Sequence, residues 1–157
     1  MIAIYAGSFD PLTLGHLDII ERSSKLFEKV IVLISISASK QGLFSVDERK
    51  KLIEQSLVSK ANIKVESHGG LTVDYLKKIE NAILIRGIRT HSDFEAEQAL
   101  AHMNKELRDQ AETLLMYSSP QVSHISSRLV REAASLGGDV SKLVPVSVEK
   151  ALKSKFR

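Results

Sequence analysis

The fold is decided by the stretch Ala6-Gly7-Ser8-Phe9-Asp10-Pro11-Leu12-Thr13-Leu14-Gly15-His16, which follows a short apolar run at residues 2–5. A strand that passes through a Gly-Ser turn into an amphipathic helix is the layout of a phosphate site. Glycine lets the backbone approach an anion, and the first helical turn offers unpaired N–H groups at the positive end of the helix dipole. His16 then lies where a ligand phosphate would bind. An ordinary turn over residues 10–13, with a solvated histidine beside it, is the alternative that this stretch alone leaves open.

Composition restricts the class of protein. The 157 residues are 43% hydrophobic, which is enough to bury the core of one domain spanning residues 1–157. Cysteine is absent, which excludes disulfides and thiolate metal sites and suits a reducing compartment. We expect a cytoplasmic protein, because the first residues lack a targeting pattern and the longest apolar run, residues 30–36, is too short to span a bilayer. A net charge of +3 with 5% aromatics suits a small anionic ligand and argues against a nucleic-acid or membrane partner.

Apolar, strand-like runs alternate with amphipathic segments along the chain. The expected strands cover residues 2–5, 30–34, 63–65, 82–85 and 113–117. The expected helices cover about 14–27, 46–57 after a capping box at Ser45, 73–79, 93–107, 125–136 before Gly137-Gly138, and 148–156. Their expected inward residues in the second half of the chain are Ala96, Leu100, Met103, Leu107, Leu129, Val130, Ala133, Val148, Ala151, Leu152 and Phe156. This order predicts an α/β fold, a Rossmann-like doubly wound five-stranded parallel sheet with helices on both faces.

Polar residues follow four of the expected strands. They are Gly7 and Ser8 after the first, Ser37, Ser39 and Lys40 after the second, Arg86, Gly87 and Arg89 after the fourth, and Ser118, Ser119, Ser126 and Ser127 after the fifth. Ligands of such sheets bind outside the carboxyl ends of the strands, where the strand order reverses. The sequence therefore predicts a site at this edge of the sheet.

Each of these groups also has an alternative interpretation. Lys40, in a loop of small residues, suits a cation that moves onto a phosphate, or is a solvated surface lysine. Arg86 and Arg89 suit a bidentate phosphate clamp, or one of them bridges to Asp93, Glu95 or Glu97 on the following helix. The hydroxyls of Ser126 and Ser127 bind phosphate oxygens or cap the helix that starts there.

The segments Gly7–Pro11 and Thr13–His16 together resemble the signature of the (H/T)xGH nucleotidyltransferases. More narrowly, they resemble the bacterial phosphopantetheine adenylyltransferase family, and the later motifs follow in the same order over nearly all of the chain. The resemblance implies an enzyme of coenzyme A biosynthesis that converts ATP and 4′-phosphopantetheine into dephospho-coenzyme A and pyrophosphate. It also implies Mg²⁺ carried mainly by the nucleotide, a homohexamer, and coenzyme A as a feedback ligand.

The resemblance further implies roles for individual residues. His16 would contact ATP and stabilise the transition state, while Ser8 and Lys40 would bind the acceptor phosphate, and these three form the implied catalytic set. Arg86 and Thr72 match acceptor-binding positions, the latter against the pantetheine arm. The implied ATP-binding positions are Ser8, Phe9, His16, Gly87, Ile88, Arg89, Glu97, Val122, Ser123, His124, Ile125, Ser126, Ser127 and Arg128.

Three positions depart from the family pattern: Ser8 stands where threonine is common, Val122 where some members have tryptophan, and Arg128 where a small hydroxyl residue is usual. The first keeps the hydroxyl, whereas the other two bear on base stacking and phosphate contact at the second ATP loop. Because a phosphate dianion is already a nucleophile, we expect catalysis by alignment and charge neutralisation without a general base. The alternatives are a related transferase for another acceptor, such as nicotinate mononucleotide or a choline-type phosphate, and an ATP-sensing module without catalysis.

Overall fold

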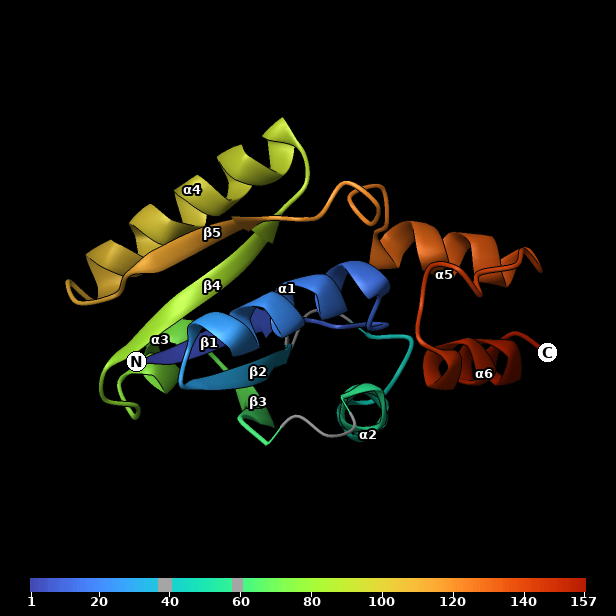
Figure 1. Cartoon of the computed structure of the whole chain (residues 1–157), viewed down its shortest axis with the longest axis horizontal. Coiled ribbons are helices and arrows are strands. Elements are labelled where there is room, and N and C mark those ends of the chain that lie inside the picture. The colour runs from blue at the N-terminus through green and yellow to red at the C-terminus, as the bar shows by residue number, and fades with distance from the viewer. Residues whose placement is uncertain (37–40, 58–60) are drawn as a thin grey trace.

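The computed structural model describes residues 1–36, 41–57 and 61–157 and contains five strands and six helices within these ranges (Figure 1). The elements are β1 (Ile2–Gly7), α1 (Leu14–Leu26), β2 (Lys29–Ile36), α2 (Val46–Ser56), β3 (Ile63–Gly69), α3 (Thr72–Leu76), β4 (Ala82–Ile88), α4 (His91–Leu107), β5 (Thr113–Tyr117), α5 (Ser127–Ser135) and α6 (Val146–Lys155). Every expected strand and helix is confirmed, with ends that differ by a few residues. None of the helices in these ranges is both long and apolar enough to cross a membrane.

The five strands form one parallel sheet in the order β3-β2-β1-β4-β5. The chain builds outward from β1 in one direction and then, starting with β4, in the other. The strand order therefore reverses between β1 and β4, and the predicted doubly wound parallel sheet is confirmed. Figure 1 shows α5 and α6 on the side of the sheet where the strands end.

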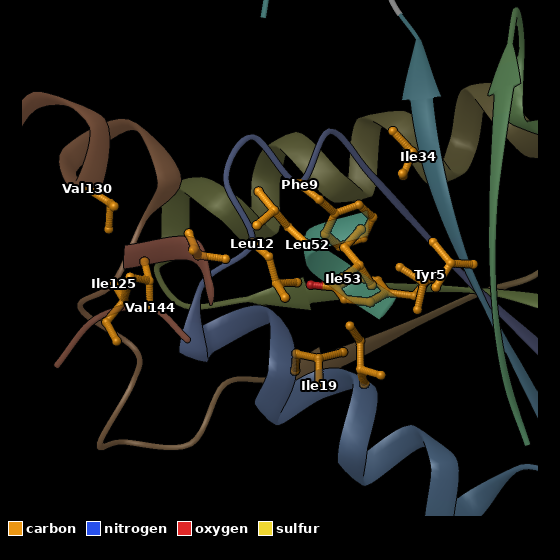
Figure 2. Packing of buried hydrophobic residues seen from close by; sticks show 14 of the residues in the cluster. Tyr5, Phe9, Leu12, Ile19, Ile34, Leu52, Ile53, Ile125, Val130 and Val144 are labelled. Atoms are coloured by element: carbon orange, nitrogen blue, oxygen red, sulfur yellow. The ribbon is translucent and has the colours of Figure 1, made fainter. Parts of the chain in front are cut away.

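Alternate residues of the central strands face opposite sides of the sheet. Ala3 and Tyr5 of β1 belong to one buried cluster, whereas Ile4 and Ala6 belong to another on the opposite face. The first cluster is completed by residues of α1, α2 and α5, among them Ile19, Leu52, Ile53 and Val130. Figure 2 shows Leu52 and Ile53 close to Phe9, and Val130 on the far side of the cluster from Tyr5. The second cluster is completed mainly by α3. Because both faces are covered, β1 and β2 carry the nearly continuous apolar runs seen in the sequence.

Two helix ends follow the local signals in the sequence. At the start of α2, Ser45 and Glu48 form the expected capping box, in which each side chain bonds the other residue's backbone N–H at 3.2 and 2.7 Å. At the end of α5, Gly137 has φ +78° and the Gly138 N–H donates to the Ala133 carbonyl at 2.8 Å. A left-handed residue closes the helix there, which explains Gly137, and a Cβ at Gly138 would lie only 2.9 Å from the carbonyl oxygen of Ala133.

The expected burial of α4 is wrong. Leu100, Met103 and Leu107 are 42%, 58% and 48% exposed, and Ala96 is exposed as well. Helical periodicity identifies an apolar stripe but does not say what covers it. In the structure α4 packs on β4 through the face next to this stripe, where Asn104 is its buried residue. The stripe therefore faces outward.

The expected burial of Leu129 and Phe156 is wrong as well. Leu129 is exposed while its neighbour Val130 is buried, because consecutive helical residues point about 100° apart and only one of them faces the core. Phe156 follows the last residue of α6 and is exposed, whereas Val148 and Leu152 within the helix are buried as expected.

Candidate active site

A cavity of about 380 Å³ lies at the carboxyl ends of β1 and β4, where the strand order reverses. The described residues that line it come from β1 and its turn, the start of α1, the end of β4 with the start of α4, and the segment leading into α5. They are Tyr5, Ala6, Gly7, Ser8, Phe9, Thr13, Gly15, His16, Arg86, Gly87, Arg89, Asp93, Glu97, Ser118, Ile125, Ser126, Ser127, Arg128 and Arg131. This is the location that the topology of an open α/β sheet predicts for a ligand.

His16 is oriented by the cap of its own helix. Thr13 is the N-cap of α1, and its backbone N–H donates to Nδ1 of His16 at 3.1 Å, while the His16 N–H donates to the Thr13 hydroxyl at 3.3 Å. Since Nδ1 accepts a hydrogen bond, the neutral imidazole carries its proton on Nε2. The ring that lines the cavity is therefore a hydrogen-bond donor through Nε2–H.

Two aromatic rings pack around His16. Phe9 lies edge-on to it with 5.1 Å between ring centroids, and Tyr5 lies 6.4 Å away. Phe9 is fully buried and has φ +47°, a left-handed conformation that is uncommon for a bulky side chain. Burial, with the nearby charges of Arg89 and Arg86, lowers the pKa of His16 to about 4. At neutral pH the histidine is therefore an uncharged donor.

The start of α1 offers fewer free N–H groups than the sequence predicts. The N–H of Leu14 donates to the carbonyl of Leu143 at 3.0 Å, and that of His16 is used by Thr13. The segment between α5 and α6 covers the helix start, a long-range contact that no local pattern reveals. Two of the first three N–H groups of α1 are therefore already used within the protein.

Both arginines of the Arg86-Gly87-Ile88-Arg89 motif are held by carboxylates of α4. Arg86 donates to both carboxylate oxygens of Glu97 at 2.6 and 2.7 Å, and also to the carbonyl of Ala6. Arg89 donates to both oxygens of Asp93 at 3.0 and 3.2 Å and to the carbonyl of Ile125 at 2.9 Å. The sequence analysis allows one of the two arginines to pair with a carboxylate of the following helix, and in the structure both of them do.

The cavity nevertheless has an excess of positive charge. Its described lining contains four guanidinium groups, from Arg86, Arg89, Arg128 and Arg131, against the two carboxylates of α4. Pairing with Glu97 and Ala6 uses three of the five N–H donors of Arg86. Two donors remain for ligand oxygens, so an arginine can be oriented by its carboxylate and still bind an anion.

The segment leading into α5 is anchored to α1. Asp18 accepts hydrogen bonds from the N–H and hydroxyl of Ser119 at 2.9 and 2.6 Å, and Arg22 bridges Asp18 to the carbonyl of Tyr117. Although burial opposes it, the hydrogen bonds from Ser119 and Arg22 hold the pKa of Asp18 below its ordinary value. The helix that carries His16 thus also positions the predicted second ATP loop.

The hydroxyls at the start of α5 are both used within the protein. Ser126 is the N-cap and accepts the N–H of Leu129 at 3.2 Å, so the capping alternative is correct for this residue. Ser127 donates to the carbonyl of Pro11 at 2.8 Å and so joins α5 to the turn after β1.

The structure brings most of the predicted site residues together. Those that line the cavity are Ser8, Phe9, His16, Arg86, Gly87, Arg89, Glu97, Ile125, Ser126, Ser127 and Arg128. Those in the described ranges that lie outside its lining are Thr72, Ile88, Val122, Ser123 and His124. Ile88 is buried, and Thr72 follows β3, which β2 separates from β1. Ser37, Ser39 and Lys40 lie outside the described residues.

Sequence reasoning assigned no role in the site to three residues of the lining, Tyr5, Thr13 and Arg131, although it placed Ser118 at this edge of the sheet and gave Asp93 as a possible arginine partner. Two of the three had a readable signal. Thr13 stands three residues before His16, the spacing of a reciprocal cap, and Arg131 stands one helical turn after Ser127. Tyr5 belongs to an apolar strand and gives no such signal.

This fold and cavity define the class of protein as a nucleotidyltransferase: residues 4–133 match the family described as cytidylyltransferase-like, and the chain belongs to it. The chain is also 51% identical over 156 residues to the phosphopantetheine adenylyltransferase of Bdellovibrio bacteriovorus, an alignment that covers 99% of this chain and 98% of that one. Within the class, the chain therefore belongs to the phosphopantetheine adenylyltransferase family.

Solved structures of two other proteins share the fold. One is a Vibrio parahaemolyticus protein assigned as a nicotinate-nucleotide adenylyltransferase, with a TM-score of 0.71, 24% identity and 97% coverage of each chain. The other is the nicotinic acid mononucleotide adenylyltransferase of Plasmodium falciparum in complex with NaAD, with a TM-score of 0.70, 19% identity and coverage of 98% of this chain and 95% of that one. At these identities the likeness concerns the fold alone.

Proposed function

We infer that the protein transfers the adenylyl group of ATP to 4′-phosphopantetheine, giving dephospho-coenzyme A and pyrophosphate in coenzyme A biosynthesis. The observation that carries this conclusion is the 51% identity, over nearly the whole chain, to a phosphopantetheine adenylyltransferase. The site supports it, because a cavity lined by four arginines and a neutral histidine suits two phosphorylated substrates.

In the proposed reaction an oxygen of the acceptor phosphate forms a bond to the α-phosphorus of ATP, and the bond from that phosphorus to the pyrophosphate oxygen breaks. The attacking phosphate needs no base to activate it. Nε2–H of His16 is proposed to donate to a non-bridging oxygen, where charge is redistributed in the transition state. Arg86 and Arg89 are proposed to align and neutralise the phosphates, with Glu97 and Asp93 fixing their orientation.

The remaining predicted contacts stay proposals. Ser8 lines the cavity beside His16 and is a candidate for the acceptor phosphate. Thr72 begins α3 after the edge strand β3, where an extended acceptor such as a pantetheine arm can run along the strand ends. For Lys40 the proposal rests on the family resemblance. Arg128 lines the cavity and is proposed to supply a cation at the second ATP loop, in place of the usual small hydroxyl.

Magnesium is proposed to enter with the nucleotide. Among the described residues, no group of three or more His, Cys, Asp or Glu side chains is arranged to hold a metal ion. The two carboxylates that line the cavity, Asp93 and Glu97, are each bonded to an arginine. These side chains do not fit a protein metal cage, and no step of the mechanism above depends on the ion.

We also propose self-association, with the homohexamer implied by the resemblance as its expected form. The support is the outward apolar stripe of α4, which contains Leu100, Met103 and Leu107, together with the exposed Leu114 and Tyr117 of the edge strand β5. Light scattering of Met103→Glu tests this: a smaller mass than the wild type is expected, and an unchanged mass contradicts a role for this face.

Coenzyme A as a feedback ligand and a cytoplasmic location are proposals too. The first is supported by the resemblance, and the second by the absence of cysteine.

A pyrophosphate-release assay tests the function. The protein is incubated with ATP and, in separate reactions, with 4′-phosphopantetheine, nicotinate mononucleotide and phosphocholine. We expect pyrophosphate release in the reaction with 4′-phosphopantetheine and in neither of the other two. Turnover only with another acceptor would identify a related transferase, and ATP binding without turnover on any acceptor would indicate a sensing module.

A further inference from the structure

Asp10 connects three segments, two of which, the turn after β1 and α5, line the cavity. Its side chain is only 8% exposed, and its two oxygens accept the N–H groups of Leu43 and Phe44 at 2.8 and 2.9 Å. Its carbonyl accepts a hydrogen bond from Arg131 of α5, whose Nη1 also lies 3.6 Å from the carboxylate. Asp10 thus joins the turn after β1 to the segment before α2 and to α5.

Other side chains hold the same turn from both sides. Arg49 of α2 donates to the carbonyl of Ser8 at 3.1 Å and to that of Phe44 at 2.9 Å. On the opposite side, Ser127 of α5 donates to the carbonyl of Pro11. Between these anchors lies Phe9, whose left-handed backbone persists only because its surroundings fix it, and whose ring packs on His16.

The placement of Asp10 argues against a role in chemistry and for a role in geometry. Ser8, Phe9 and Arg131 line the cavity, whereas Asp10 is not among its described lining residues. An ionised carboxylate accepts hydrogen bonds through both oxygens, which matches two successive N–H donors. An asparagine has one oxygen and one NH₂ group, so it would turn a donor towards one of these N–H groups. The geometry therefore requires the carboxylate itself.

We propose that Asp10 is a positioning residue of adenylyl transfer, whose carboxylate and carbonyl hold the Ser8–Phe9 turn, the segment at residues 42–44 and Arg131 in one arrangement. This inference rests on the function proposed above. Displacement of aligned groups by about 1 Å lowers a rate by about 10²-fold. Loss of the carboxylate is therefore expected to act on turnover through Phe9 and His16.

The test compares Asp10→Asn with Asp109→Asn, an exposed acid at the opposite edge of the sheet, between α4 and β5. Both variants are checked for folding by circular dichroism at 25 °C. Asp10→Asn is expected to lower kcat about 10²-fold, with a much smaller change in KM for ATP, and Asp109→Asn to behave as the wild type. Full turnover of a folded Asp10→Asn overturns the proposal.

A second variant perturbs the contact without changing Asp10. A Cβ at Gly42 would lie 2.9 Å from Nη2 of Arg49, 3.0 Å from Oδ2 of Asp10 and 3.1 Å from the carbonyl oxygen of Phe44, so Gly42→Ala is expected to displace the groups that hold this turn. We expect a fall in kcat in the same direction, and a double variant with Asp10→Asn that loses less than the product of the two effects. If Asp10→Asn does not fold, wild-type turnover of Gly42→Ala overturns the proposal.

A readout that needs no substrate separates this proposal from the proposed function. In the wild type the His16 ring is expected to titrate near pH 4 by NMR, with its resonance assigned from a His16→Asn variant. Loosening the turn in Asp10→Asn or Gly42→Ala lets water reach the ring, and the pKa of His16 should rise towards 6.5. An unmoved titration in folded variants overturns the positioning role. If the wild type is inactive but the His16 titration is shifted in the variants, the proposed function is overturned and the positioning role of Asp10 stands.

Discussion

Replacing Arg86 by alanine should affect both stability and ligand binding. Arg86 and Glu97 form a bidentate ion pair with N–O distances of 2.6 and 2.7 Å, and their side chains are only 26% and 15% exposed. Removing the arginine eliminates charge-assisted hydrogen bonds and leaves a half-buried carboxylate without its partner. We expect the free energy of unfolding to fall by about 2–3 kcal/mol. For a chain of this length that corresponds to a Tm lower by about 4–12 °C.

The assay is thermal unfolding of the wild type, Arg86→Ala, Glu97→Gln and the double variant, combined with calorimetric binding of 4′-phosphopantetheine. A coupling energy of at least about 1 kcal/mol between the two positions is expected from the double-mutant cycle. Arg86→Ala should also weaken acceptor binding more than Glu97→Gln does, because only the arginine is proposed to contact phosphate. An unchanged Tm for Arg86→Ala would refute the ion pair, and unchanged acceptor binding would make Arg86 a purely structural residue.

Protonation, helix capping and loop anchoring give three further predictions. The pKa of His16 is about 4 in the fold against 6.5 for an ordinary histidine, so the unfolded chain binds more protons than the folded one between these pH values. The free energy of unfolding should therefore fall as the pH drops from 6.5 to 4. Urea unfolding at a series of pH values measures this dependence, and a His16→Asn variant with the same dependence on pH as the wild type would contradict the prediction. Ser45→Ala removes the cap of α2 and should lower the free energy of unfolding by about 1 kcal/mol in chemical denaturation, with kcat unchanged; an altered kcat would contradict a purely structural cap. Asp18→Ala releases Ser119 and should raise KM for ATP by about tenfold, equivalent to about 1.4 kcal/mol, and steady-state kinetics with an unchanged KM would exclude the anchoring role.

The sheet and the location of the site could be predicted from the sequence because their signals are local. Continuous apolar runs indicate strands covered on both faces, and Arg86 and Ser8 fall just after two such runs. Parallel strands then bring these residues to one edge, and the cavity is found there.

The environment of α4 could not be predicted in this way. Its apolar residues repeat with the period of a helix, but the period does not reveal which side another layer covers. Met103 therefore looks like a core residue in the sequence and is more than half exposed in the structure.

The contacts that hold the site are also invisible to local patterns. Asp10 is bonded to residues 33 and 34 positions away and to Arg131, 121 positions away. The carbonyl of Leu143, which accepts a hydrogen bond from the N–H of Leu14, is also far from its partner in the sequence. Only a three-dimensional arrangement shows that the aspartate of an ordinary-looking Asp-Pro turn joins the segment before α2 to α5.

The role of His16 as a neutral donor is the central claim about the site. It is tested most directly by the steady-state kcat of His16→Ala, measured together with calorimetric ATP binding. By analogy with the loss of one oxyanion donor, kcat should fall about 10²–10³-fold. The KM for ATP should change little, because Arg86, Arg89 and Arg128 still line the cavity. Near-normal turnover would contradict the claim, and loss of ATP binding in a folded variant would show instead that His16 binds the ground state.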